Sequence, residues 1–287
     1  MAENDGAREG AHYDEIADDY ARHWAPVIRP AALRVVDLLA TRLGRAAATA
    51  ADPAPARVLD VGTGTGTLAI AVLGRWTSAR VAGIDASAEM VERARRGAVA
   101  AQDGATERLE LIVAPADRLP FQDGDFDAAV SSFVLQLVPN RAAALREVRR
   151  VLRGGGTFVY ATWLRESREL AGADRILEEV LAEFGFDPPD PDDSRGDATS
   201  PAAAAAELRR IGFRNVHATR AEVHHRWTPR SYAAFAEHFA ESSLFADLVG
   251  RERRALRRRL IEALSKAPPG DLELRLPIVY VEGTRIP

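Results

Sequence analysis

Val58-Leu59-Asp60-Val61-Gly62-Thr63-Gly64-Thr65-Gly66-Thr67 is the stretch on which the fold depends. Its first four residues have strand character, and a loop with glycine at every second position follows. A helix-compatible apolar run comes next, over residues 68–73. Glycine accepts positive φ and lets a ligand approach the backbone, while a helix N-terminus presents unpaired N–H groups and a partial positive charge. The stretch therefore predicts a site for the polar part of a nucleotide-like ligand.

The glycine spacing separates this turn from two other nucleotide-binding motifs. Gly62, Gly64 and Gly66 form G-x-G-x-G, whereas the dinucleotide fingerprint is G-x-G-x-x-G. A phosphate-binding P-loop ends in G-K-[ST], and this turn contains no lysine. Two acidic residues, Asp60 before the turn and Asp85 after the next expected strand, further narrow the choice among nucleotide-binding motifs.

Four more stretches follow the glycine turn in order: Val81-Ala82-Gly83-Ile84-Asp85-Ala86-Ser87, Ala116-Asp117-Arg118-Leu119-Pro120-Phe121, Phe126-Asp127-Ala128-Ala129-Val130-Ser131-Ser132 and Arg150-Val151-Leu152-Arg153-Gly154-Gly155-Gly156. Together the five motifs resemble those of the class I S-adenosylmethionine-dependent methyltransferases. They are similar in particular to the small-molecule branch, which includes quinone-biosynthesis C-methyltransferases and many natural-product methyltransferases. The resemblance covers about residues 12–163.

This resemblance implies S-adenosylmethionine as the cofactor, S-adenosylhomocysteine as its product, and a set of binding residues. Tyr20 of the N-terminal element is expected to close over the cofactor. Asp85 is expected to accept both ribose hydroxyls, since an ionised carboxylate offers several acceptor sites. Asp117 is expected to accept from the adenine amino group, with Met90 beneath the ring and the backbone of Ser131 in contact with the methionine part. The full predicted set is Tyr20, Gly62, Thr63, Gly64, Gly66, Asp85, Ala86, Met90, Ala116, Asp117, Arg118 and Ser131.

Several of these residues have a purely structural alternative. Asp85 or Ser87 can cap the helix that begins close behind them. Met90 can be a core residue, and Asp117 can belong to a turn. Each alternative predicts a side chain that makes its contacts within the protein rather than toward a pocket.

The N-terminal helix carries a second set of candidates. Tyr13, Ala17, Tyr20 and Trp24 recur at helical spacing, which is typical of an aromatic face packed on the core. The matching Y-D-x-x-A-x-x-Y element of the similar family closes over the cofactor. His23 and Trp24 are also candidates for contact with the substrate.

Composition limits the classes of function. At 287 residues the chain fits one large domain or a domain with a cap. A formal charge of −4 argues against nucleic-acid binding, and the absence of cysteine excludes disulfides and thiolate chemistry. No signal sequence and no apolar run long enough for a membrane span occur, so a cytoplasmic location is expected. The acidic loop at 187–200 matches no calcium-binding spacing, so no metal is expected.

Alternating strands and helices predict a Rossmann-like α/β fold with a doubly wound, seven-stranded, mostly parallel sheet and a helical substrate cap. By resemblance the last strand is antiparallel. The glycines at 154–156 are expected to cap the helix that precedes them. The basic run 251–259 reads as a solvated helix face or as a docking patch for an acidic carrier. The predicted segments are a disordered tail (1–11), the cofactor-binding core with its lid (12–163), an inserted cap segment (164–200), a core helix and strand (201–227), a helical cap (228–270) and a closing strand (271–287).

The predicted activity is transfer of a methyl group to a small, largely apolar molecule that is phenol-, quinone- or polyketide-like. The aromatic and aliphatic cap favours such a substrate. An alternative keeps the fold for a non-methylating reaction such as cyclisation. Gln136 stands where several relatives have histidine, so no catalytic base is assigned. The histidines that could act as a base are His12, His23, His224, His225 and His238. The sequence does not decide between a monomer and a homodimer.

Overall fold

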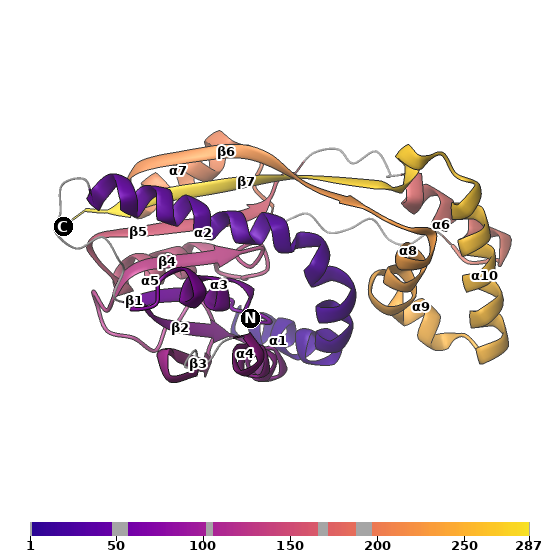
Figure 1. The fold of residues 1–287 in the computed structure, drawn as a ribbon, viewed down its shortest axis with the longest axis horizontal. Helices are drawn as coiled ribbons and strands as arrows, with labels where there is room; N and C mark the ends of the chain where they lie inside the picture. Colours follow the sequence, from indigo (N-terminus) through magenta and orange to yellow (C-terminus); the bar gives the residue numbers. More distant parts are fainter. Residues whose placement is uncertain (1, 48–56, 102–105, 166–171, 188–196, 287) are drawn as a thin grey trace.

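The computed structural model describes residues 2–47, 57–101, 106–165, 172–187 and 197–286. Its centre is a seven-stranded sheet with the order β3-β2-β1-β4-β5-β7-β6 (Figure 1). β1 to β5 pair in parallel, and β7 pairs antiparallel with β5 and β6. The predicted α/β fold and its antiparallel last strand are therefore confirmed. The strands are β1 (Arg57–Val61), β2 (Arg80–Asp85), β3 (Leu109–Val113), β4 (Phe126–Ser132), β5 (Leu152–Trp163), β6 (Phe213–Arg226) and β7 (Glu273–Arg285).

Helices cover both faces of this sheet. Apolar side chains of α2 and α3 pack on one face, and those of α5 and α7 pack on the other (Figure 1). The helices are α1 (Ala2–Asp19), α2 (Ala25–Ala47), α3 (Thr67–Arg75), α4 (Ala88–Ala101), α5 (Arg141–Val151), α6 (Gly172–Glu183), α7 (Pro201–Ile211), α8 (Pro229–Phe235), α9 (Ser242–Asp247) and α10 (Gly250–Lys266), with two π-helical turns, η1 (Tyr20–Trp24) and η3 (Ala236–Ala240).

The strand order reverses between β1 and β4. After β1 the chain continues outward to β2 and β3, whereas β4 and β5 lie on the other side of β1. In an open parallel sheet, ligands bind outside the carboxyl ends of the strands at such a reversal. The glycine turn that follows β1 lies at this place.

The cap is carried by the two longest strands. β6 and β7 extend beyond the rest of the sheet, and α6, α8, α9 and α10 gather around their far ends (Figure 1). Buried leucines of α6 and α10 share one apolar cluster, and the Tyr232 hydroxyl of α8 donates to Asp174 of α6 at 2.6 Å. The two segments predicted as cap, before and after the core helix α7, thus lie together.

Two local predictions differ from the structure. Residues 2–10, predicted as a disordered tail, belong to α1, which begins at Ala2 in a stretch rich in alanine and glutamate, both good helix formers. The glycines at 154–156 do not cap α5; the helix ends at Val151 and these glycines lie within β5. The reason is that β5 starts pairing at Leu152, opposite Phe126 of β4.

Parts of the predicted cap segment 164–200, including much of its acidic loop, lie outside the described residues. Within the described ones, no helix combines the length and the apolar character that crossing a membrane requires.

Candidate functional site

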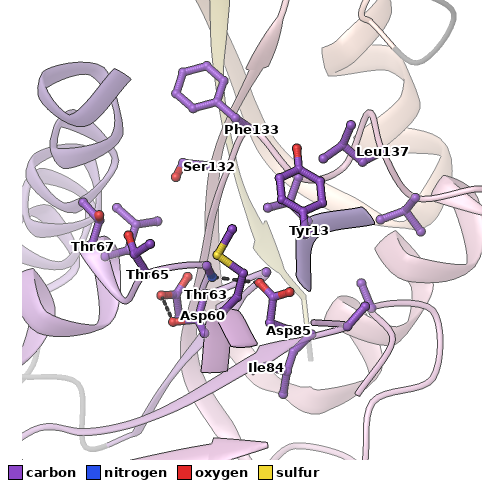
Figure 2. A pocket seen from close by; sticks show the side chains of 18 of the residues that line it. Tyr13, Asp60, Thr63, Thr65, Thr67, Ile84, Asp85, Ser132, Phe133 and Leu137 are labelled. Carbon is purple, nitrogen blue, oxygen red and sulfur yellow. Dashed lines mark hydrogen bonds between the residues drawn. The ribbon is translucent and has the colours of Figure 1, made fainter. Parts of the chain in front are cut away.

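A pocket opens at the carboxyl ends of β1, β2 and β4, where the strand order reverses (Figure 2). It is bounded by the glycine turn, the ends of these strands, the segments that follow β3 and β4, and residues of α1, η1 and α2. Its lining residues are Gly10, Tyr13, Tyr20, Ala25, Ile28, Arg29, Ala32, Asp60, Gly62, Thr63, Gly64, Thr65, Thr67, Leu68, Ile84, Asp85, Ala86, Met90, Ala114, Pro115, Ala116, Asp117, Ser132, Phe133, Val134, Leu137, Val138 and Pro139.

The glycines of the turn have different tasks. Gly62 has a φ of 69°, and a Cβ there would lie 2.3 Å from Val134 Cγ2, so only glycine fits. A Cβ on Gly66 would lie 3.1 Å from Ala94, so this glycine permits close packing of α3 on α4. Gly64 has a φ of 53° and nothing within 4 Å of its Cβ position. Because Gly64 lines the pocket, this open space is available to a ligand.

Asp85 ends β2 and holds the turn in place. Its carboxylate accepts from the Gly64 N–H at 2.8 Å and from the Ser87 N–H at 3.0 Å. Burial raises the pKa of Asp85, and these backbone donors oppose that rise. Ser87, rather than Asp85, caps α4, since its hydroxyl accepts from the Met90 N–H at 3.0 Å. Asp85 therefore keeps lone pairs for a ligand in the pocket.

Asp60 lies beside Thr63 in the lining of the pocket (Figure 2). It is only 1% exposed. Its Oδ2 accepts from the Thr63 hydroxyl at 2.8 Å and from the Ala69 N–H at 3.0 Å. Its Oδ1 has no hydrogen-bond partner within the described part of the chain. Burial raises the pKa of Asp60 to about 7. A buried, unsatisfied carboxylate oxygen is costly, so this atom is suited to a cationic N–H donor from a ligand.

Helix α1 lies beside this pocket and is held there by contacts with α4. The Asp14 carboxylate accepts from the Ser87 hydroxyl at 2.5 Å and from the Glu89 N–H at 3.0 Å, at the start of α4. These donors hold the pKa of Asp14 below its usual range. Asp18 forms an ion pair with Arg93 of α4. This docking brings Tyr13 and Tyr20 to the pocket.

All but three of the residues predicted to bind the cofactor line the pocket. Gly66 lies behind the turn, where it packs on α4. Arg118 is exposed. Ser131 is fully buried, and its hydroxyl donates to the Val61 carbonyl at 2.8 Å. Strand alternation turns the Ser131 side chain away from the pocket, which its neighbour Ser132 lines, and the backbone contact expected of Ser131 stays a prediction.

Several lining residues were missed by the sequence analysis. Asp60 was used there only to classify the motif, although a carboxylate directly before a glycine turn is itself a signal. Arg29 is the only cationic side chain among the lining residues of the described chain. Phe133 has a φ of 57°, a left-handed conformation that is rare and strained for an aromatic residue. This conformation has no sequence signal.

Aromatic rings continue from the pocket toward the cap. Phe133 stacks on Trp163 with ring centroids 4.3 Å apart, and Trp163 contacts Trp24 of η1 at 6.2 Å. Trp24 in turn stacks on Phe235 and Phe239 of the cap at 5.4 and 5.9 Å. A series of aromatic rings therefore connects Phe133, at the pocket, with the cap.

None of the candidate bases lines the pocket in the described structure. His12 is exposed on α1, and His224 is exposed with its ring 3.6 Å from the Glu273 carboxylate. His225 packs edge-on against Trp227 at 4.4 Å. His23 and His238 stack on each other where η1 meets η3. Gln136 accepts from the Thr162 hydroxyl at 2.9 Å, which fixes its amide.

Among known protein families, the methyltransferase domain family matches residues 59–160 of this chain. A ubiquinone/menaquinone biosynthesis C-methyltransferase UbiE from Geobacter sp. (strain M21) is 44% identical over 105 residues, covering 36% of this chain and 43% of that relative. A malonyl-[acyl-carrier protein] O-methyltransferase from Geobacter sulfurreducens is 39% identical over 107 residues, covering 37% and 38%. The chain thus spans less than half the length of these curated relatives.

Solved structures resemble the whole fold. The [4+2]-cyclase SpnF superposes with a TM-score of 0.54 at 22% identity, over 89% of this chain and 82% of that one. The YcgJ protein from Bacillus subtilis gives 0.53 at 21%, over 86% and 99%. At these identities the likeness shows the fold alone. Together the comparisons confirm the resemblance to the class I S-adenosylmethionine-dependent methyltransferases.

Proposed function

We propose that this chain is a class I S-adenosylmethionine-dependent methyltransferase that binds S-adenosylmethionine and transfers its methyl group to a small, largely apolar molecule that is phenol-, quinone- or polyketide-like. The observation that carries the proposal is the pocket itself. Its lining combines the carboxylates Asp60, Asp85 and Asp117 with apolar residues, and Phe133 in this lining belongs to the series of aromatic rings that leads to the cap.

We place the methionine part in the pocket beside Asp60. The unpartnered Asp60 Oδ1 would accept from the α-ammonium group. Arg29, at the same pocket, would face the carboxylate as its counter-charge. The open space beside Gly64 lets the ligand approach the backbone, and a Cβ would fill it.

We place the nucleoside in the pocket beside Asp85. Asp85 has acceptor capacity left for the two ribose hydroxyls after its bonds to Gly64 and Ser87. Met90 and Ala116 are buried apolar residues of the lining, suited to the faces of the adenine ring. Asp117 stands beside them as an acceptor for the exocyclic amino group.

The acceptor molecule would lie where Ser132, Phe133 and Leu137 line the pocket. Bound S-adenosylmethionine supplies an electrophilic methyl group on a good leaving group, so the protein mainly has to position donor and acceptor. Phe133, stacked on Trp163, offers an aromatic face to a flat substrate. The strained backbone of Phe133 directs its ring there, and strain of this kind is concentrated at functional sites.

The experiment is isothermal titration of ligand-free protein with S-adenosylmethionine and with S-adenosylhomocysteine, followed by a turnover screen of phenols, quinones and polyketides. Micromolar binding of both ligands, with S-adenosylhomocysteine formed only when an acceptor is present, is the expected result. Absence of binding by both ligands would overturn the proposal. Binding together with substrate conversion, but without formation of S-adenosylhomocysteine, would assign the site to a non-methylating reaction such as cyclisation.

A further inference from the structure

Three potential metal ligands meet where the N-terminal segment touches the cap. Asp19 is the last residue of α1, His23 lies in η1 and His238 lies in η3. The Asp19 Oδ1 atom is 3.9 Å from His23 Nε2 and 4.0 Å from His238 Nδ1. One ligand atom from each residue lies within 4.8 Å of the other two.

These side chains are partly shielded but reachable from solvent. Their exposed fractions are 15% for His23 and 35% for both Asp19 and His238. The two imidazole rings stack with their centroids 5.2 Å apart and their planes at 6°. The one carboxylate that neighbours His238 in sequence, Glu237, is already paired with Arg253 and Arg257. Asp19 is therefore the carboxylate that faces the two histidines.

The backbone on both sides of the cluster is unusual. His23 and His238 each lie in a π-helical turn, the only two such turns among the described residues. π-Helical turns are rare and are found mostly at functional sites. One turn belongs to the N-terminal lid and the other to the cap, and the two turns contact each other.

We propose that Asp19, His23 and His238 form a binding site for a divalent transition-metal ion. Two imidazole nitrogens and one carboxylate oxygen are a common donor set for zinc and for iron(II), with water completing the shell. Ligand bonds of about 2.0–2.1 Å in a tetrahedral shell place neighbouring ligand atoms about 3.3 Å apart. The side chains have to close by roughly 1 Å from their present separations, which rotation about their own bonds provides.

Such an ion would join the lid to the cap. Tyr20, in the same turn as His23, lines the pocket, and its ring contacts Phe239, the residue after His238. Metal binding would hold these two turns together beside the pocket. The proposal does not depend on methyl transfer, because its ligands lie outside the pocket lining.

The test is titration of the full chain, freed of metal by a chelator and dialysis, with Zn²⁺ alone and with Co²⁺ alone. One equivalent of Zn²⁺ is expected to bind with a micromolar or lower dissociation constant. Co²⁺ is expected to develop visible ligand-field absorption. In His23→Ala and His238→Ala the affinity should fall by at least about 100-fold, since each removes one of three ligands.

His217→Ala is the matched control, because His217 is an exposed histidine on β6. It should bind Zn²⁺ like the parent chain. Asp19→Asn changes the least volume and should also weaken binding, and its melting temperature without metal shows that it folds. Equal Zn²⁺ binding by the parent and the His238→Ala chain, loss of binding in His224→Ala instead, or no binding at all would each overturn the proposal.

Discussion

In residues 57–163, carboxylates and backbone N–H groups gather at the ends of β1 and β2 around the pocket, whereas the cap turns apolar side chains onto one another. Asp60 in the first region is buried with an oxygen that has no partner in the described chain. In the cap, Leu177, Leu256 and Leu260 are buried in a shared cluster. The first region thus presents polar groups that can bind a ligand, and the apolar contacts of the cap serve its own stability. Substitutions in the two regions should therefore separate ligand affinity from stability.

The largest effect is expected from Gly62→Ala. The new Cβ would lie 2.3 Å from Val134 Cγ2, on a backbone with a φ of 69°. Overpacking costs about 1–3 kcal/mol and left-handed backbone about 1–2 kcal/mol for alanine, so the loss should be roughly 2–5 kcal/mol. Chemical denaturation measures it, and S-adenosylmethionine binding should fall with it.

Gly74→Ala is the matched control for this change. Gly74 is exposed within α3, and its Cβ position meets nothing within 4 Å. Alanine there should stabilise by up to about 1 kcal/mol because it favours the helix. Equal stabilities of the Gly62→Ala and Gly74→Ala chains would contradict the assigned packing of the turn.

The next largest effect is expected from Asp85→Ala, on affinity rather than fold. Loss of charged hydrogen bonds should weaken S-adenosylmethionine binding by about 1–3 kcal/mol, or roughly 5- to 150-fold, in calorimetry. Part of this loss arises because the Gly64 N–H also loses its acceptor. Glu183→Ala, which removes an exposed ion pair with Arg259 in the cap, should leave the affinity unchanged. An unchanged affinity for Asp85→Ala would remove this residue from the site.

The same division explains what the sequence could predict. The roles expected at Gly62, Gly64 and Asp85 depend only on a strand, the turn after it and the next strand. These elements are close in sequence, so short motifs are enough to predict the roles. Which of Ser131 and Ser132 turns its side chain to the pocket could not be predicted, because the motif does not fix where the pleat of β4 begins. The hydrogen bond that the Ser87 hydroxyl, at the start of α4, donates to Asp14 joins segments far apart in sequence. No local pattern encodes such a contact, or the meeting of His23 with His238.

A smaller effect is expected from pH, through Asp60. Its pKa of about 7 in the folded chain lies above the ordinary value of 3.8. Between these values the folded state binds more protons than the unfolded state, so ligand-free stability should fall as pH rises through this window. A cationic ammonium group prefers the ionised carboxylate. Affinity for S-adenosylmethionine should therefore rise by about tenfold from pH 6 to pH 8.

Asp60→Asn isolates this group. Calorimetry over the same pH range should give a flat profile for the variant, because the asparagine does not ionise. A wild-type profile that is already flat, or a variant that keeps the slope, would place the α-ammonium group away from Asp60.

The smallest effect is expected from Tyr232→Phe in the cap. The change removes one hydroxyl, which donates to Asp174 at 2.6 Å and links α8 to α6. A hydrogen bond to a charged group contributes about 1.5–3 kcal/mol, and Asp174 can recover part of this through water, so a loss near 1 kcal/mol is expected in chemical denaturation. S-adenosylmethionine affinity should not change, because neither residue lines the pocket. A matching loss of affinity would show that the cap and the cofactor region respond as one unit. It would contradict the separation of ligand affinity from stability between the two regions.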